Sequence, residues 1–339
     1  MALAQFIQDA WNRQAEWLVV LRPLSWLYHC GFVVNKSLYR MGLKKVYTAP
    51  VPVMVIGNIT VGGSGKTPLL IELVKYLQSQ QVRVAVISRG YGGSGPFPAL
   101  VTLDSEPTQV GDEPCLIVQA TKVPMAVGSN RRASIELLMQ QSVEPIDFII
   151  SDDGLQHWSL QRQLEWIVLD KNRGLGNERL LPEGYLREPK SRLQNSTVIE
   201  HAVQPQSELS MHLQAVEPYL LNARSDQDAL WFNPDLDYYA VVGIGFPQRF
   251  YQTLESLNVT HFQCHEFADH YDYEIQDLQF EDTNPIITTE KDAVKLLALL
   301  KQNPDFQREI WVVPVDAVLS EACYALFNRQ LNQLGIQIG

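Results

Sequence analysis

The run Thr60-Val61-Gly62-Gly63-Ser64-Gly65-Lys66-Thr67 decides the fold. It follows a short apolar stretch, 51–57, which is rich in β-branched residues and is typical of a buried parallel strand. Apolar residues at helical spacing follow over 68–78 and predict a helix. A glycine-rich loop between a strand and a helix is the setting of a phosphate-binding P-loop, because its backbone N–H groups can turn toward phosphate oxygens.

The P-loop pattern gives its residues distinct roles. The following helix directs its positive N-terminal end at the bound anion. Lys66 would reach the β- and γ-phosphates, and Thr67 would bind Mg²⁺. The usual pattern begins with glycine, where this chain has Thr60. A glycine-rich turn with an unrelated lysine is the alternative, and the strand–loop–helix setting argues against it. The expected ATP-binding residues are Thr60, Val61, Gly62, Gly63, Ser64, Gly65, Lys66 and Thr67.

A second apolar run, 146–150, ends in Ser151-Asp152-Asp153-Gly154. A P-loop fold needs an acid at such a strand end, where it holds Mg²⁺ directly or through water. Two adjacent carboxylates also favour a bound cation, because the cation offsets their repulsion. The alternative is a solvated turn bent at Asp153-Gly154. With the P-loop upstream, metal binding is the better interpretation.

The rest of the chain alternates strands and helices, which predicts an α/β fold with a P-loop NTPase-like parallel sheet and helices on both faces. A polar stretch, 204–237, interrupts the alternation and marks a domain junction. A second alternation follows and predicts a smaller α/β domain that includes a C-terminal helix at 321–334. The expected domains are an N-terminal segment, 1–50, a P-loop kinase domain, 51–210, and the smaller domain, 211–339.

Composition excludes several classes of protein. The net charge of −11 argues against nucleic-acid binding, because a phosphate backbone would be repelled. The four cysteines are scattered without a C-x-x-C pair, which supports neither a zinc site nor a disulfide framework and favours reduced thiols in a cytosolic protein.

The first fifty residues differ from the rest of the chain. They hold six basic and two acidic side chains, with Trp11, Trp17 and Trp26 among aliphatic residues. No continuous apolar run reaches the about 18 residues of a spanning helix, and Arg22-Pro23 interrupts the longest apolar stretch. Tryptophans with basic side chains suit the interface of an anionic membrane. We expect an amphipathic segment on a membrane surface; a pair of basic, core-packing helices is the alternative.

Several segments together resemble the tetraacyldisaccharide 4'-kinases of the lipid A pathway. Residues 57–68 are similar to the P-loop of that family, in which threonine is usual at the position of Thr60. One variation is Pro182-Glu183-Gly184-Tyr185, where a small residue is expected at position 183. The resemblance runs from the basic N-terminal segment to at least Lys295. The other matching motifs are 88–92, 110–114, 152–157, 186–189, 245–250, 267–270 and 288–293.

The resemblance implies transfer of the γ-phosphoryl group of ATP, with Mg²⁺, to the 4'-hydroxyl of an acylated glucosamine disaccharide 1-phosphate lipid, giving lipid IV-A. It implies a peripheral enzyme at the cytoplasmic face of a bacterial inner membrane, with its active site between two α/β/α domains. By position, Asp112 matches the catalytic base, and His270 assists it. The metal-binding group matches Thr67, Asp152, Asp153 and Glu188. Other active-site positions match Tyr91, Gln156, His157 and Arg187.

Two other functions fit the sequence less well. A guanine-nucleotide switch usually carries N-K-x-D after a strand, and this chain has no such tetrapeptide; Asn35-Lys36-Ser37-Leu38 is the nearest and lacks the acid. A membrane scaffold that binds nucleotide without catalysis would not need the Asp112 and His270 pair.

Overall fold

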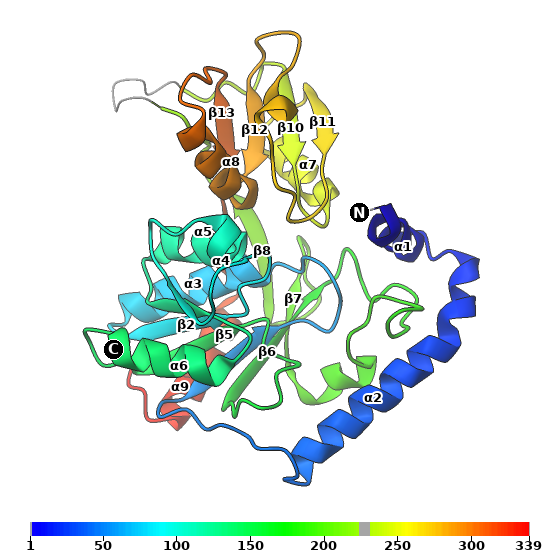
Figure 1. Ribbon diagram of the computed structural model, residues 1–339, viewed down its shortest axis with the longest axis vertical. Coiled ribbons are helices and arrows are strands. Elements are labelled where there is room, and N and C mark those ends of the chain that lie inside the picture. Colours follow the sequence, from blue (N-terminus) through cyan, green and yellow to red (C-terminus); the bar gives the residue numbers. More distant parts are fainter. Residues whose placement is uncertain (1, 224–230, 339) are drawn as a thin grey trace.

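The larger domain is built on a nine-stranded sheet whose central strand is β1 (Val53–Gly57). The computed structural model describes residues 2–223 and 231–338, so the outer ends of the segments expected at 1–50 and 211–339, and residues 224–230, lie outside it. The strand order is β14-β8-β7-β6-β1-β5-β2-β4-β3. Figure 1 labels β8, β7, β6, β5 and β2 of this sheet. Only the outermost pairs, β14–β8 and β3–β4, are antiparallel. This sheet confirms the expected α/β class.

The elements of this domain are close to their expected positions where the sequence pattern is strong. The helix expected at 68–78 is α3 (Lys66–Ser79). The other strands are β2 (Val84–Ser88), β3 (Ala99–Val101), β4 (Met125–Val127), β5 (Phe148–Asp152), β6 (Leu164–Asp170), β7 (Thr197–His201), β8 (Ser210–Ala215) and β14 (Val315–Leu319). The other helices are α4 (Pro107–Val110), α5 (Asp112–Thr121), α6 (Arg131–Gln141), α9 (Glu321–Gln333) and a 3₁₀ turn, Lys190–Asn195.

Strand β1 shows how both faces of the sheet are covered. Successive side chains of a strand point to opposite faces. Met54 and Ile56 belong to a core shared with α3, α5 and α9. Val53 instead packs in a core with α6, and Val55 packs with Leu155 and Tyr185. The strand is therefore buried on both sides, as its continuous apolar sequence predicts.

The smaller domain has a five-stranded sheet in the order β11-β10-β12-β13-β9. All its strand pairs are parallel except β9–β13. Its elements are β9 (Tyr219–Leu220), β10 (Tyr238–Val242), α7 (Pro247–Ser256), β11 (Phe262–Glu266), a 3₁₀ turn (Ile275–Leu278), β12 (Ile286–Thr289), α8 (Glu290–Gln302) and β13 (Ile310–Val313).

The C-terminal helix does not belong to the smaller domain, contrary to the boundary expected at 211–339. Strand β14 pairs with β8 in the large sheet, and Cys323, Phe327 and Leu331 of α9 pack in the large-domain core. The smaller domain is thus inserted between β8 and β14. A hydrogen bond from Val216 N to the Pro314 carbonyl (2.9 Å) joins the two chain segments that connect the domains. Strand β8, the pairing partner of β14, lies in the polar stretch 204–237, where the sequence pattern predicts no strand.

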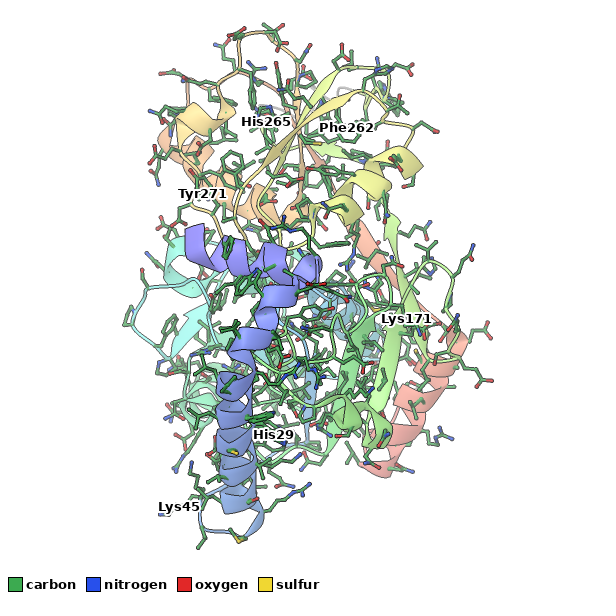
Figure 2. The ribbon with its side chains drawn as sticks, turned by 90° about the vertical axis from the view of Figure 1, so that its right-hand side faces the viewer. His29, Lys45, Lys171, Phe262, His265 and Tyr271 are labelled. Carbon is green, nitrogen blue, oxygen red and sulfur yellow. The ribbon has the colours of Figure 1, made fainter. Side chains whose placement is uncertain are left out.

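The N-terminal segment consists of α1 (Ala2–Asn12), a 3₁₀ turn (Glu16–Leu21) and α2 (Arg22–Arg40). Helix α2 runs along the outside of the large domain, and α1 turns toward the gap between the domains near Tyr271 (Figures 1 and 2). Pro23 stands in the first turn of α2, where proline is tolerated. By length and composition alone, Glu16–Arg40 could cross a membrane, with a mean hydropathy of 1.3.

The two faces of α2 have different surroundings. Toward the large domain, Ser25 Oγ donates to the Leu180 carbonyl (3.0 Å), and Tyr28 Oη donates to the Arg187 carbonyl (2.9 Å). On the other face Trp26 and Leu27 are about two-thirds exposed. Trp11, which we grouped with the outward-facing tryptophans, instead points inward, because its indole N–H donates to the Pro182 carbonyl (3.0 Å). The inward face therefore packs as core-packing helices would, and membrane contact by the exposed face stays a prediction.

Candidate active site

A cleft of about 1650 Å³ lies between the two domains. Its wall is formed by the P-loop, by the loops after β2 and β5, by residues 244–250 and 266–272 of the smaller domain, and by one side of α1. Three predicted site residues, Thr60, Asp112 and Glu188, are buried behind this wall. The predicted residues on the wall are Val61, Gly62, Gly63, Ser64, Gly65, Lys66, Thr67, Tyr91, Asp152, Asp153, Gln156, His157, Arg187 and His270.

The P-loop has the backbone that its glycines predict. Gly65 has φ +91° and immediately precedes Lys66, the first residue of α3. A Cβ at Gly65 would lie 2.8 Å from His201 Nδ1, so both the conformation and the space require glycine. His201 lies under the loop, 2.9 Å from the Ser64 carbonyl. Burial lowers the pKa of His201 to about 4, so it is neutral near pH 7 and its Nδ1–H can donate to that carbonyl.

Asn58 organises the loop from within, a role that the sequence analysis did not assign. Its amide donates to Thr60 Oγ1 (3.1 Å) and to the Gly62 carbonyl (3.2 Å), and its Oδ1 lies 3.2 Å from Lys66 Nζ. Thr60 therefore supports the loop from behind, which gives a physical reason for threonine in place of glycine. The position of Asn58 directly after β1 was the available signal.

The two acids at the end of β5 have opposite environments. Asp152 is fully buried, and its Oδ1 has no hydrogen-bond partner among the described residues. Burial, together with the charges of Glu113 and Asp153, raises the pKa of Asp152 to about 7. Burial also opposes ionisation of Asp153, but Lys66 and Arg187 outweigh it and lower the pKa to about 2. Asp153 Oδ2 lies 2.9 Å from Arg187, and Oδ1 lies 3.4 Å from Lys66.

The acids fit a magnesium ion that shares its coordination with a bound phosphate. In the described parts of the chain, no three His, Cys, Asp or Glu side chains gather closely enough to form a complete metal cage. Mg²⁺ is usually held by one or two carboxylates together with substrate phosphates, so a full cage is not required. The Oδ1 of Asp152, which has no partner among the described residues, could supply one such ligand, and a cation would offset the cost of ionising this carboxyl group.

Glu188 has different neighbours from the other expected metal ligands. Its Oε1 accepts a hydrogen bond from Gln156 (2.7 Å), and its Oε2 lies 3.3 Å from Arg192 Nε. Burial raises its pKa. These contacts hold Gln156 at the cleft wall, and a metal-binding role for Glu188 stays a prediction.

Asp112 and His270 meet across the domain boundary. Asp112 is the first residue of α5 in the large domain, and His270 lies in the loop after β11. His270 Nδ1 is 2.9 and 3.0 Å from the two carboxylate oxygens. Burial alone would raise the pKa of Asp112, but the hydrogen bond from His270 and the charge of Lys291 lower it to about 2. Burial disfavours charge on His270 as well, yet the Asp112 contact prevails and raises its pKa.

Further residues of the cleft support these groups. The Tyr91 ring packs edge-on against His270, with ring centroids 4.9 Å apart. His157 lies 2.9 Å from Ser159 Oγ, and burial lowers its pKa to about 4. Arg131, to which the sequence analysis gave no role, donates to the carbonyls of Gly128 (2.7 Å) and Asp152 (3.3 Å). It thereby ties the ends of β4 and β5 together, and no sequence signal distinguishes it from a surface arginine.

The site therefore has two halves. One half is a P-loop with a lysine and two strand-end acids, and the other is a carboxylate–histidine pair. A single cleft is lined by the first half and by the histidine of the second, with the carboxylate buried behind it. Such a fold and site define a P-loop phosphotransferase. The sequence profile of the tetraacyldisaccharide-1-phosphate 4'-kinases, the LpxK family, matches residues 17–332. The chain belongs to this family, and it is a kinase.

Individual relatives agree over nearly the full length of the chain. The tetraacyldisaccharide 4'-kinase of Psychrobacter cryohalolentis is 45% identical, with 100% of this chain and 99% of that protein aligned. That of Pseudomonas syringae pv. tomato is 41% identical, over 98% and 99%. The crystal structure of LpxK from Aquifex aeolicus in complex with ATP superposes with a TM-score of 0.74 at 25% identity, covering 94% of this chain and 99% of that one.

Proposed function

We propose that the protein transfers the γ-phosphoryl group of ATP to the 4'-hydroxyl of a tetraacylated glucosamine disaccharide 1-phosphate, giving lipid IV-A. The observation that carries this proposal is the meeting of the P-loop and the Asp112–His270 pair in one cleft. At about 1650 Å³, the cleft is larger than the roughly 300–1,000 Å³ of a site for one small ligand. It has room for a nucleotide and for the sugar end of a lipid.

On the nucleotide side, the protein positions and neutralises phosphates. Lys66 and the N-terminus of α3 attract the β- and γ-phosphates, and Asp153 and Asn58 hold the Lys66 ammonium in place. Thr67 and Asp152 would hold Mg²⁺, with Asp153 beside them, and the ion would neutralise charge on the phosphate oxygens. Gln156, His157 and Arg187 complete this side of the wall.

On the acceptor side, the Asp112–His270 pair accepts the hydroxyl proton. A sugar hydroxyl is a weak nucleophile, and a positioned base assists its attack. Asp112 accepts the hydrogen bond from Nδ1–H and so leaves Nε2 as the basic atom of the ring. The resemblance implies Asp112 as the base and His270 as its assistant. Because His270 stands on the cleft wall with Asp112 buried behind it, we propose that the pair works as one unit in which Nε2 takes the proton and Asp112 stabilises the protonated ring.

The N-terminal segment supports a peripheral position at the cytoplasmic face of the bacterial inner membrane. The outward face of α2 exposes apolar side chains such as Trp26 and Leu27, and basic residues gather at its C-terminal end. Its inward face is bound to the large domain through Ser25 and Tyr28, which favours lying on the membrane over crossing it. Helix α1 continues from this surface into the cleft wall, so an acceptor lipid would meet the site from the membrane side.

A radiolabel transfer assay tests this function. Purified protein is incubated with γ-³²P-labelled ATP, Mg²⁺ and the tetraacylated disaccharide 1-phosphate in mixed micelles. A matched acceptor lacking only the 4'-hydroxyl is the control. We expect label in the first lipid and none in the second. Equal labelling of both acceptors, or of neither, would contradict the proposal.

A further inference from the structure

Lys291 is the centre of an ionic cluster beside the Asp112–His270 pair. It is the second residue of α8, and its side chain is only 17% exposed. Its Nζ lies 2.9 Å from Asp269 Oδ1, 3.2 Å from Glu113 Oε1 and 3.8 Å from Asp112 Oδ2. One ammonium group is therefore close to three carboxylates at the edge of the cleft.

Two of these contacts, those with Asp112 and Glu113, cross from one domain to the other. Asp112 and Glu113 form the first turn of α5 in the large domain, whereas Asp269, His270 and Lys291 belong to the smaller one. The chain passes between the two domains at two places, after β8 and before β14. The Asp112–His270 pair exists only while the domains are closed on each other, so a contact that holds α5 against α8 also assembles the pair.

We propose that Lys291 is a positioning residue for phosphoryl transfer, which latches the smaller domain onto α5 and keeps the Asp112–His270 pair able to accept a proton. This role rests on the proposed function and adds a residue to it. Lys291 does not react; it acts through its neighbours in the pair. Its guanidinium counterpart, arginine, would keep the charge but not the geometry of a single ammonium point.

The charges around the pair determine the direction of the expected effect. Lys291 and Lys295 face it from α8, Glu113 from α5 and Asp269 from the loop of His270 itself; Tyr91 adds an uncharged ring. Lys295 lies 3.9 Å from Asp112 and 3.4 Å from Asp292. Among the described residues it forms no ion pair with Glu113 or Asp269, so it is a poor substitute for Lys291.

Loss of the Lys291 charge raises the pKa of both members of the pair. A nearby positive charge favours the carboxylate of Asp112 and disfavours the protonated imidazole of His270. Without it, Glu113 and Asp269 are also left without their cation. Phosphoryl transfer requires that the pair be free to accept a proton. When Lys291 is neutralised, the acid limb of the profile of kcat against pH therefore moves to higher pH.

The test compares Lys291→Met and Lys291→Arg with wild type, and uses Lys301→Gln, an exposed lysine at the end of the same helix, as the matched control. The kcat and the KM for each substrate are measured from pH 5.5 to 9. For Lys291→Met we expect kcat at pH 7 to fall about tenfold or more and the acid limb to rise by about one pH unit. Lys291→Arg should keep the wild-type limb with a smaller loss of kcat, and Lys301→Gln should match wild type.

A double-mutant cycle separates the latch from a general loss of stability. Glu113→Gln and Lys291→Met are combined, and thermal unfolding is recorded for every variant. If the two side chains act as one contact, the double variant is slowed little more than the slower single variant. Losses of kcat that multiply, or an unshifted acid limb in an active Lys291→Met, overturn the positioning role. If Lys291→Met does not fold, Glu113→Gln and Lys291→Arg carry the same comparison. Failure of wild type to phosphorylate the lipid overturns the proposed function itself.

Discussion

Replacing Asp112 by asparagine removes the negative charge of the proton-accepting pair without changing its size. Asp112 lies 2.9–3.0 Å from His270 Nδ1, and its pKa of about 2 keeps it charged at every working pH. The neutral amide can no longer stabilise a protonated ring, and its NH₂ group can donate to Nδ1, which moves the ring proton to Nε2. We expect kcat to fall about 10²–10⁴-fold, which corresponds to about 2.7–5.5 kcal/mol in the activation free energy.

The same change should leave nucleotide binding intact, because Asp112 is buried behind the cleft wall and its ionic partners are His270 and two lysines of α8, which lie outside the P-loop. Initial rates at saturating lipid give kcat and the ATP KM, and titration with a fluorescent ATP analogue gives the nucleotide Kd. A kcat within about threefold of wild type, or a loss confined to the ATP KM, would refute the assignment of Asp112 to proton transfer.

The remaining predictions concern the P-loop, the metal and the membrane. Lys66→Ala should lower kcat/KM by about 10²-fold or more while the melting temperature stays near that of wild type, and near-normal turnover would exclude the P-loop assignment. Asp152→Asn should raise the Mg²⁺ concentration needed for half-maximal rate, measured by titrating Mg²⁺ at fixed ATP; an unchanged requirement would remove Asp152 from the metal site. Gly65→Ala should cost at least about 2 kcal/mol of unfolding free energy in a urea titration, because alanine at φ +91° is strained and its Cβ meets His201. Full-length protein should sediment with anionic liposomes and be released by high salt, whereas a variant with three exposed basic residues changed to glutamine should sediment less; equal sedimentation of both would contradict electrostatic docking. Those three residues are Arg40, Lys44 and Lys45.

The basic residues of the N-terminal segment show what structure adds to a charge count. Arg22 is bound by Glu183 at 2.8 Å, and Lys36 lies 4.8 Å from the centre of the Trp158 ring. Both were grouped with the membrane-facing charges in the sequence, yet both also bind the large domain. Glu183, the position where a small residue is expected, is buried because Arg22 neutralises it. A pattern of charges predicts an amphipathic segment but does not say which of them already have partners.

The fold was predictable where local signals are strong. The P-loop, the strand before Asp152 and the helix at 68–78 combine apolar patterns with glycine or acid boundaries, and the structure has them within a few residues. The pairing of β8 with β14 was not predictable from the sequence. It joins residues about a hundred positions apart and depends on how the inserted domain folds between them. Short sequence windows do not contain such contacts.

The candidate site divides in the same way. Lys66, Thr67 and the two acids were found from local pattern, whereas Asp112 and His270 came from the family resemblance alone. They lie 158 positions apart and meet only through the packing of two domains. Asn58 and Lys291 were visible within matched segments, but their roles depend on three-dimensional neighbours: the loop carbonyls for Asn58, and Glu113 and Asp269 for Lys291.

The position of the new phosphate in the product tests the proposed 4'-kinase activity most directly. The tetraacylated disaccharide 1-phosphate is converted with unlabelled ATP and Mg²⁺, and the product is examined by mass spectrometry and by two-dimensional ¹H–³¹P correlation NMR. The account predicts one added phosphate whose phosphorus correlates with the proton on C4' of the distal glucosamine. A phosphate correlated with any other ring proton, or recovery of the unchanged monophosphate under conditions in which ATP binds, would contradict it.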